Sequence, residues 1–270
     1  MNTLDSVNFD LLGMSFILQQ MMAPILNDPL LQIVLFLLTA LMVVCVKIKK
    51  LTLFAAVTAT ILGFLVALAS GLKGISMLAA FFVLSVLATS HKKAEKLKIH
   101  PAESAGSPEV EKTGRDSWQV LANGGIAGIT AILVLLNPEN SSYYLLMMAA
   151  SLASALADTL SSELGTLYGS RFFNVITFKK EAKGLDGVIS IEGTIIGAIG
   201  AGIIALIYAG FGKTALTVAL AGILGNLTDS ILGALLERKN LIGNNLVNFL
   251  NTLFAAVIAL LLYLVFNIPG

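Results

Sequence analysis

The chain has 270 residues, of which 57% are hydrophobic and only 12% charged. Soluble domains usually carry about 25% charged residues, so this composition and a mean hydropathy of +0.89 exclude a water-soluble globular fold. The net charge of +1 says nothing about partners, and a single cysteine, Cys45, excludes an internal disulfide framework. Residues 1–29 contain no Lys or Arg, so we expect no cleavable signal or transit peptide.

Apolar stretches predict the membrane spans. A bilayer core about 30 Å thick needs roughly 20 helical residues to cross it. Eight stretches of that order lie at residues 30–46, 52–70, 74–90, 119–137, 143–167, 187–211, 214–236 and 245–267. A ninth candidate, 8–26, is more polar, so residues 1–29 form either a first span or an interfacial helix. The predicted fold class is therefore all-α: one polytopic membrane domain over residues 1–270, with eight to nine transmembrane helices.

The basic residues predict the topology. Alternate connections hold fifteen of the seventeen Lys and Arg residues, and the other side receives only Lys73 and Lys213. Because basic loops stay in the cytoplasm, the long hydrophilic loops 91–118 and 168–186 are expected there and the C-terminus outside. Without a basic, Ser-rich transit segment, a prokaryotic cell membrane is the expected location. The basic run HKKAEKLK, residues 91–98, fits a membrane surface better than a nucleic acid, so no nucleic-acid partner is expected.

Polar side chains within the spans gather near the predicted cytoplasmic ends of five helices. Ionisable groups in spans are costly, by about 2.5 kcal/mol or more each, and so point to function. The gathered residues are Arg115, Asp116, Gln119, Asn123, Ser151, Ser154, Asp158, Ser162, Glu163, Lys183, Asp186, Ser190, Glu192, Asn226, Asp229, Ser230, Glu237, Asn244, Asn248 and Asn251.

Each polar group also has a structural interpretation. Asn, Ser and Gly often serve only to pack helices and bond them together, and Arg115, Lys179 and Lys180 can act simply as topology determinants. That interpretation is weakest for Asp158 and Asp229, because a buried carboxylate without a basic neighbour in its own span needs a proton or a cation. Acidic and amide groups beside Lys and Arg suit Mg²⁺ and phosphates, since phosphoryl transfer needs mainly positioning and charge neutralisation.

Five ordered motifs carry a family resemblance: GRDSWQVLANGG, ADTLSSELG, KGLDGVISIEGT, LGNLTDSILGA and NNLVNFLNT. From about residue 80 onward the chain resembles the integral-membrane family that contains plant phytyl-phosphate kinase, and it is distantly similar to dolichol kinase and CDP-diacylglycerol synthase. The resemblance implies a Mg²⁺-dependent kinase that transfers phosphate from CTP, or another nucleoside triphosphate, to an isoprenyl monophosphate. The motif-bearing helices would cover residues 119–267.

The resemblance also implies the site residues. Asp158, Glu163 and Asp229 would be catalytic and would hold the metal. The nucleotide and phosphate groups would be bound by Asn123, Ser162, Lys183, Gly184, Asp186, Gly187, Ser190, Asn226, Ser230, Asn245 and Asn248. Asp186 and Glu237 depart from the family pattern, where amides or small residues are expected, and either could alter the substrate or the donor.

Four alternative functions stay open. A lipid cytidylyltransferase or a polyprenol kinase of the same architecture would use the same polar groups. A cation-coupled transporter would use the intramembrane acids differently, although transporter sites tend to lie near the midplane between internal repeats, and no persuasive repeat is present. A structural scaffold would leave the buried carboxylates unexplained. The expected partners are a nucleoside triphosphate, an isoprenoid lipid phosphate and membrane lipids, and a homodimer is compatible with the sequence.

Overall fold

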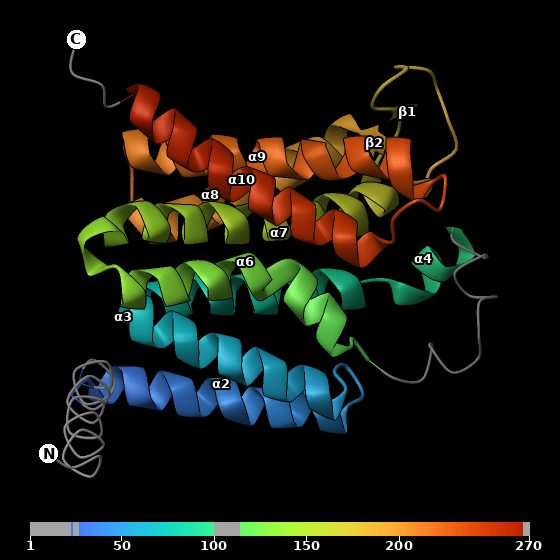
Figure 1. Cartoon of the computed structure of the whole chain (residues 1–270). Helices are drawn as coiled ribbons and strands as arrows, with labels where there is room; N and C mark the ends of the chain where they lie inside the picture. The colour runs from blue at the N-terminus through green and yellow to red at the C-terminus, as the bar shows by residue number, and fades with distance from the viewer. Residues whose placement is uncertain (1–22, 24–26, 100–113, 267–270) are drawn as a thin grey trace, which may run out of the picture.

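The computed structural model describes residues 23, 27–99 and 114–266, and it is an α-helical bundle (Figure 1). In this part of the chain, seven helices are long and apolar enough to cross a membrane, which confirms the all-α membrane fold class. The long helices are α2 (Pro29–Lys47), α3 (Leu53–Ser90), α6 (Ser117–Leu136), α7 (Ser141–Tyr168), α8 (Ile191–Ala209), α9 (Lys213–Leu232) and α10 (Asn244–Phe266).

Helix α3 explains the difference between seven helices and eight predicted spans. It has 38 residues, and Gly71 breaks it with φ 57° and ψ −143°. A Cβ atom on Gly63 would lie 3.8 Å from Leu78 Cδ2, so the two halves fold back against each other. They correspond to the predicted spans 52–70 and 74–90. The ninth candidate, residues 8–26, lies outside the described residues apart from Ala23.

The polar connections meet at one end of the bundle. The short helix α4 (Lys93–Ile99) and the strands β1 (Phe172–Asn174) and β2 (Val188–Ser190) lie at this end, whereas helix α10 finishes at the opposite end (Figure 1). We call it the basic end, defined by the connecting residues 48–52, 91–99, 114–116, 169–190 and 238–243. The turns that contain Lys73 and Lys213 lie at the opposite end. The structure therefore agrees with the sequence-based expectation that most basic connections share one side of the membrane.

Helix α7 forms the centre of the bundle and packs against α3, α6, α8, α9 and α10. Small residues allow this close approach. A Cβ atom on Gly165 would lie 2.6 Å from the Cα of Gly193 on α8, and one on Gly225 of α9 would lie 2.2 Å from Ser154 Oγ. Because no larger side chain fits at these contacts, α8 and α9 lie directly against α7, and α9 approaches it at Ser154.

The connection between α7 and α8 contains an antiparallel pair of strands, β1 (Phe172–Asn174) and β2 (Val188–Ser190), with Phe172 opposite Ser190. The predicted span 187–211 was therefore wrong at its start. Residues 188–190 are extended by strand pairing, and α8 begins at Ile191, where Ser190 Oγ accepts a hydrogen bond from Gly193 N at 3.1 Å. This is an N-cap, which satisfies a free helix-end donor.

The predicted span 214–236 consists of two elements in the structure. Helix α9 ends at Leu232, and residues Gly233–Glu237 form one π-helical turn, η2. Another short element, the 3₁₀ turn η1 (Pro138–Asn140), joins α6 to α7. Turns of the π type are frequent at functional sites, and η2 follows directly after the polar residues of α9.

Candidate functional site

The central feature of the basic end is a pair of carboxyl groups. Asp158 on α7 and Asp229 on α9 are both half-buried, and their side chains lie within hydrogen-bonding reach of each other. Asn251 Nδ2, on α10, donates to Asp229 Oδ1 at 2.7 Å. Ser154 Oγ in turn donates to Asn251 Oδ1 at 3.1 Å. Since Ser154 and Asn251 have no exposed surface, a buried polar chain orients Asp229.

The surroundings of the pair are acidic. The carboxylates of Glu163 and Glu237 act electrostatically on Asp158, and that of Asp186 acts on Asp229. Two carboxylates in contact and partly removed from water cannot both carry an uncompensated charge. The pair therefore requires either a shared proton or a cation.

Beside the pair, a second set of polar contacts joins α7 to α9. Ser161 Oγ lies 3.0 Å from both the Asp158 carbonyl oxygen and Asn226 Oδ1. Asn226 is buried, and a Cβ atom on Gly197 of α8 would lie 2.7 Å from its Nδ2. Ser230 Oγ donates to the Asn226 carbonyl oxygen at 3.4 Å. Asn226 thus serves as a helix-joining group near the pair.

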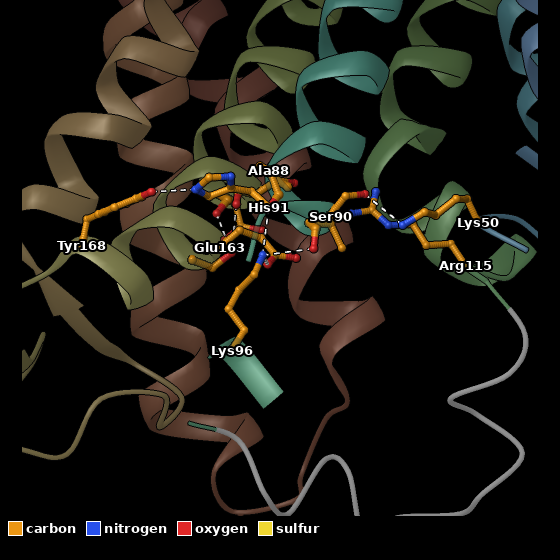
Figure 2. Close-up of polar contacts among 12 residues, drawn as sticks. Lys50, Ala88, Ser90, His91, Lys96, Arg115, Glu163 and Tyr168 are labelled. Carbon is orange, nitrogen blue, oxygen red and sulfur yellow. Dashed lines mark hydrogen bonds and ion pairs between the residues drawn. The ribbon is translucent and has the colours of Figure 1, made fainter. Parts of the chain in front are cut away.

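Glu163 does not join the pair in a ready-made metal site. It forms an ion pair with Lys96 Nζ of α4 at 2.5 Å (Figure 2). The same ammonium donates to the carbonyl oxygens of Ala88 and Thr89 at the end of α3. Within the described ranges, no three Asp, Glu, His or Cys side chains are placed to hold a metal ion. Of the three predicted metal ligands, the structure brings Asp158 and Asp229 into contact and places Glu163 in an ion pair with Lys96, and the metal-binding role of all three stays a prediction.

Arg115 lies at the same end, just before α6 (Figure 2). Its Nη2 donates to Thr89 Oγ1 at 2.9 Å. Burial lowers the pKa of the Arg115 guanidinium, and the carboxylates of Glu163 and Asp158 oppose that shift. Arg115 is therefore a partly buried cation within electrostatic range of the carboxyl pair, although the sequence favoured a topology determinant at this position.

Two backbone hydrogen bonds hold Arg115 in place. Arg115 N donates to the Lys50 carbonyl oxygen at 2.9 Å, and Thr52 N donates to the Arg115 carbonyl oxygen at 3.0 Å. A Cβ atom on Gly114 would lie 2.1 Å from the Lys50 carbonyl carbon, so only glycine permits this approach. Lys50 Nζ also donates to Ser90 Oγ at 2.9 Å (Figure 2).

The loop predicted to face phosphate packs against η2. Gly184 and Gly187 have left-handed φ values of 85° and 73°, and a Cβ atom on Gly187 would lie 2.3 Å from Ala234 Cβ. Arg238 donates to the Asp186 carbonyl oxygen. Lys183 is exposed on this loop, and Asp186 is exposed too. The structure therefore brings the loop to the end of α9, whereas the Ser190 hydroxyl is engaged as the cap of α8.

The remaining predicted residues lie at different places. Ser162 is exposed, and its hydroxyl donates to the Asp158 carbonyl oxygen at 2.9 Å. Asn123 is half-buried on α6 and donates to the Gln119 carbonyl oxygen at 3.0 Å. Asn245 and Asn248 are half-buried near the start of α10.

Two residues outside the predicted set contribute most to the geometry. Asn251 contacts Asp229, and Ser161 contacts Asn226. The spacing of Asn244, Asn248 and Asn251 already indicated one face of a helix, which was the available signal for Asn251. Ser161 lies one position before the predicted Ser162, and no pattern in the sequence pointed to it.

A bundle of membrane-spanning helices with a carboxyl pair at its basic end defines a polytopic membrane protein with a buried polar site. The chain belongs to the family described as integral membrane protein DUF92, whose model matches residues 36–256. The expected resemblance to an integral-membrane family is confirmed by this match. The whole site described above, from Arg115 to Asn251, lies within the matched region.

Individual relatives come from prokaryotes and plants. An uncharacterized membrane protein of Methanocaldococcus jannaschii is 36% identical over 236 residues, which cover 84% of this chain and 94% of the relative. An uncharacterized membrane protein of Synechocystis is 31% identical over 78% of this chain and 82% of its own length. The chloroplastic protein VTE6 of Arabidopsis thaliana is 28% identical over 76% of this chain and 62% of its own length. No solved structure matches the chain.

Proposed function

We propose that the protein is a membrane-embedded kinase that transfers a phosphoryl group from a nucleoside triphosphate, with CTP favoured, to an isoprenyl monophosphate. The observation that carries this proposal is the contact between the Asp158 and Asp229 carboxyl groups at the basic end of the bundle. A carboxyl pair that needs a cation suits a reaction in which that cation also neutralises phosphates.

The pair fits Mg²⁺ by its chemistry. Mg²⁺ prefers oxygen ligands and usually takes one or two protein carboxylates, with water and substrate phosphates filling the remaining positions. Asp158 and Asp229 provide two such groups, and Asn251 fixes the orientation of one of them. When bound, Mg²⁺ would supply neutralisation of the charge on the transferring phosphoryl group.

The transfer itself requires little proton chemistry. An oxygen of the lipid monophosphate forms a bond to the γ-phosphorus, and the bond from this phosphorus to the bridging oxygen breaks, which releases the nucleoside diphosphate. Because a monophosphate dianion attacks without losing a proton, positioning and electrostatic stabilisation suffice. Arg115 supplies a fixed positive charge near the pair, and Lys183 supplies a second one on the exposed loop.

The family resemblance supports the choice of acceptor. The five motifs resemble the family that contains plant phytyl-phosphate kinase, and four of them provide Arg115, Asp158, Asp229 and Asn251, which form the site. The basic end would face the cytoplasm of a prokaryotic cell, because Lys- and Arg-rich loops are retained there. Nucleoside triphosphates are available on that side, and the lipid would reach the site from within the membrane.

A product assay on detergent-purified protein tests the proposal. Phytyl or geranylgeranyl monophosphate is offered with Mg²⁺ and each of the four nucleoside triphosphates, and products are identified by mass spectrometry. We expect a prenyl diphosphate that is lost in Asp158→Asn and in Asp229→Asn. Val57→Ala, on the lipid-facing side of α3, is a control that should retain activity. A CDP-linked lipid would instead identify a cytidylyltransferase, and no product with any donor would overturn the proposal.

A further inference from the structure

An apolar cavity of about 140 Å³ lies between α2, α3 and α6, apart from the carboxyl pair. Leu35 and Met42 of α2, Phe81 and Phe82 of α3, and Val120 of α6 are among its lining residues. Three polar residues of the α6 segment, Arg115, Gln119 and Asn123, also line it. The cavity is therefore apolar along its length and has a single cationic group.

The two threonine hydroxyls that line the cavity already donate hydrogen bonds within the protein. Thr39 Oγ1 donates to the Leu35 carbonyl oxygen at 2.9 Å, and Thr60 Oγ1 donates to the Ala56 carbonyl oxygen at 2.8 Å. Each of these two hydroxyls is thus bonded within its own helix, so the polar groups that the lining offers to a ligand are those of Arg115, Gln119 and Asn123. Apolar surface of this kind favours hydrocarbon over water or a nucleotide.

The lining of the cavity extends from the basic end into the bundle. It includes Leu51, which precedes α3, and continues to Phe64 within α3. At 1.5 Å per residue the helical part from Leu53 to Phe64 rises about 17 Å, compared with about 30 Å for the hydrocarbon core of a bilayer, so the cavity of about 140 Å³ encloses part of one extended hydrocarbon chain. A hydrocarbon chain bound here would start at the basic end and finish inside the bundle.

The polar end of the cavity is suited to an anion. Arg115 donates to the neutral hydroxyl of Thr89, and it forms no ion pair within 4.0 Å in the described part of the chain. Asn123 Oδ1 is buried and has no partner among the described residues. An anionic phosphate monoester at this end of the cavity would find a cation in Arg115.

The same guanidinium connects the cavity to the carboxyl pair. Arg115 lies within electrostatic range of Asp158 and Glu163, and the backbone bridge to Lys50 fixes it at the mouth of the cavity. A phosphate held at Arg115 would therefore be at the border between the cavity and the acidic site.

We propose that this cavity between α2, α3 and α6 binds the hydrocarbon chain of a single-chain isoprenyl monophosphate, with the phosphate at Arg115. The identity of the lipid rests on the proposed function, whereas the location rests on the cavity itself. The first half of α3 and the helix α2 thereby gain a role as the lipid-binding part of the protein.

Photo-crosslinking of the purified full-length chain tests the location directly. A geranylgeranyl monophosphate with a diazirine near its terminal isoprene unit is irradiated with the protein, and the modified peptides are mapped by mass spectrometry. We expect crosslinks in α2, α3 and α6. Ala59→Phe fills the cavity and should reduce crosslinking at least about fivefold, whereas Ala40→Phe, the same change on the exposed side of α2, should leave it unchanged.

Two further comparisons distinguish binding of the hydrocarbon chain from binding of the phosphate. Ala79→Phe fills the cavity from the second half of α3 and should reproduce the Ala59→Phe result, with thermal unfolding used to confirm that both variants are folded. Arg115→Gln should weaken binding of the monophosphate about tenfold or more, because a charge-assisted hydrogen bond is lost. The same variant should bind geranylgeraniol like the unaltered protein.

The possible outcomes distinguish this proposal from the proposed function. Crosslinks confined to α8, α9 or α10, unaffected by Ala59→Phe, would overturn the cavity assignment even if phosphorylation is observed. Crosslinks in the cavity without any phosphorylated product would support the lipid site and overturn the kinase. Equal competition by the two-chain lipid phosphatidylglycerol would overturn the assignment to a single isoprenyl chain.

Discussion

Asn251 on α10 donates a hydrogen bond from Nδ2 to Oδ1 of Asp229 on α9, at a distance of 2.7 Å. The amide oxygen of Asn251 meanwhile accepts from Ser154 on α7. Three helices are thus joined at one amide group, and the side chain that faces Asp158 cannot rotate without breaking this chain. The proposed chemistry depends on this orientation as much as on the carboxylates themselves.

Replacement of Asn251 by Ala should impair both stability and activity. Ser154 and Asp229 would lose a buried partner, which costs about 1 to 3 kcal/mol of the free energy of unfolding, and Asp229 would lose its orientation. Ser154→Ala is the matched control, because it removes only an interhelical bond worth about 0.6 kcal/mol and keeps the bond to Asp229. Thermal unfolding and prenyl phosphate turnover measure the two effects. Equal turnover in both variants would contradict the orienting role of Asn251.

Addition of Mg²⁺ should stabilise the unaltered protein against heat, because an ion that binds only the folded state raises its stability. The gain is about 2.7 kcal/mol when the free ion is present at one hundred times its dissociation constant. Asp158→Asn should abolish the shift in melting temperature, whereas Glu163→Gln should retain it, since Glu163 is paired with Lys96. Na⁺ at matched ionic strength is the control salt. A loss of the shift in Glu163→Gln would restore Glu163 to the metal site.

Hydropathy and charge were sufficient to predict the bundle. Spans of about 20 apolar residues follow from the thickness of the membrane, and even the fold-back at Gly71 matches the break between the predicted spans 52–70 and 74–90. The pairing of β1 with β2 was not predicted, because three-residue strands carry no periodic signal. Residues 188–190 resemble part of an apolar helix in sequence, but Phe172–Asn174 pair with them as a strand.

The residues of the candidate site could be predicted from the sequence, but most contacts between their side chains could not. Asp158 and Asp229 could be identified because carboxylates are rare in spans, and the structure brings them together. The sequence did not show that Lys96, in a loop, would pair with Glu163, because such a contact depends on how α4 folds back. Arg115 resembled other basic residues at helix ends until its burial and its place at the cavity distinguished it.

The loop between β1 and β2 should depend on Gly187. Its φ of 73° costs about 1 to 3 kcal/mol for a residue with a side chain, and a Cβ atom would lie 2.3 Å from that of Ala234. Gly187→Ala should therefore lower the melting temperature and, by moving the loop away from η2, reduce turnover. Gly202→Ala is the control, because no atom outside the neighbouring backbone of α8 lies within 4 Å of the added carbon. Similar melting temperatures for the two variants would contradict the docking of the loop.

The ion pair between Lys96 and Glu163 should join α4 to the bundle without taking part in the chemistry. The side chains are only 11% and 24% exposed, and Lys96 also bonds two carbonyl oxygens at the end of α3. Glu163→Gln should lower the free energy of unfolding by about 1.5 kcal/mol, the lower range for a hydrogen bond to a charged group. Lys96→Met should cost more, because three acceptors lose their donor.

A double-mutant cycle measures the coupling energy between Lys96 and Glu163. If the two side chains interact directly, the combined variant should be less destabilised than the sum of the single variants, by an amount within the 0.5 to 3 kcal/mol typical of contacting residues. Prenyl phosphate turnover at a temperature where all variants are folded should change less than twofold in Glu163→Gln. Additive losses would show that the contact contributes no coupling energy. A large loss of turnover at full stability would instead place Glu163 in the catalytic site beside Asp158.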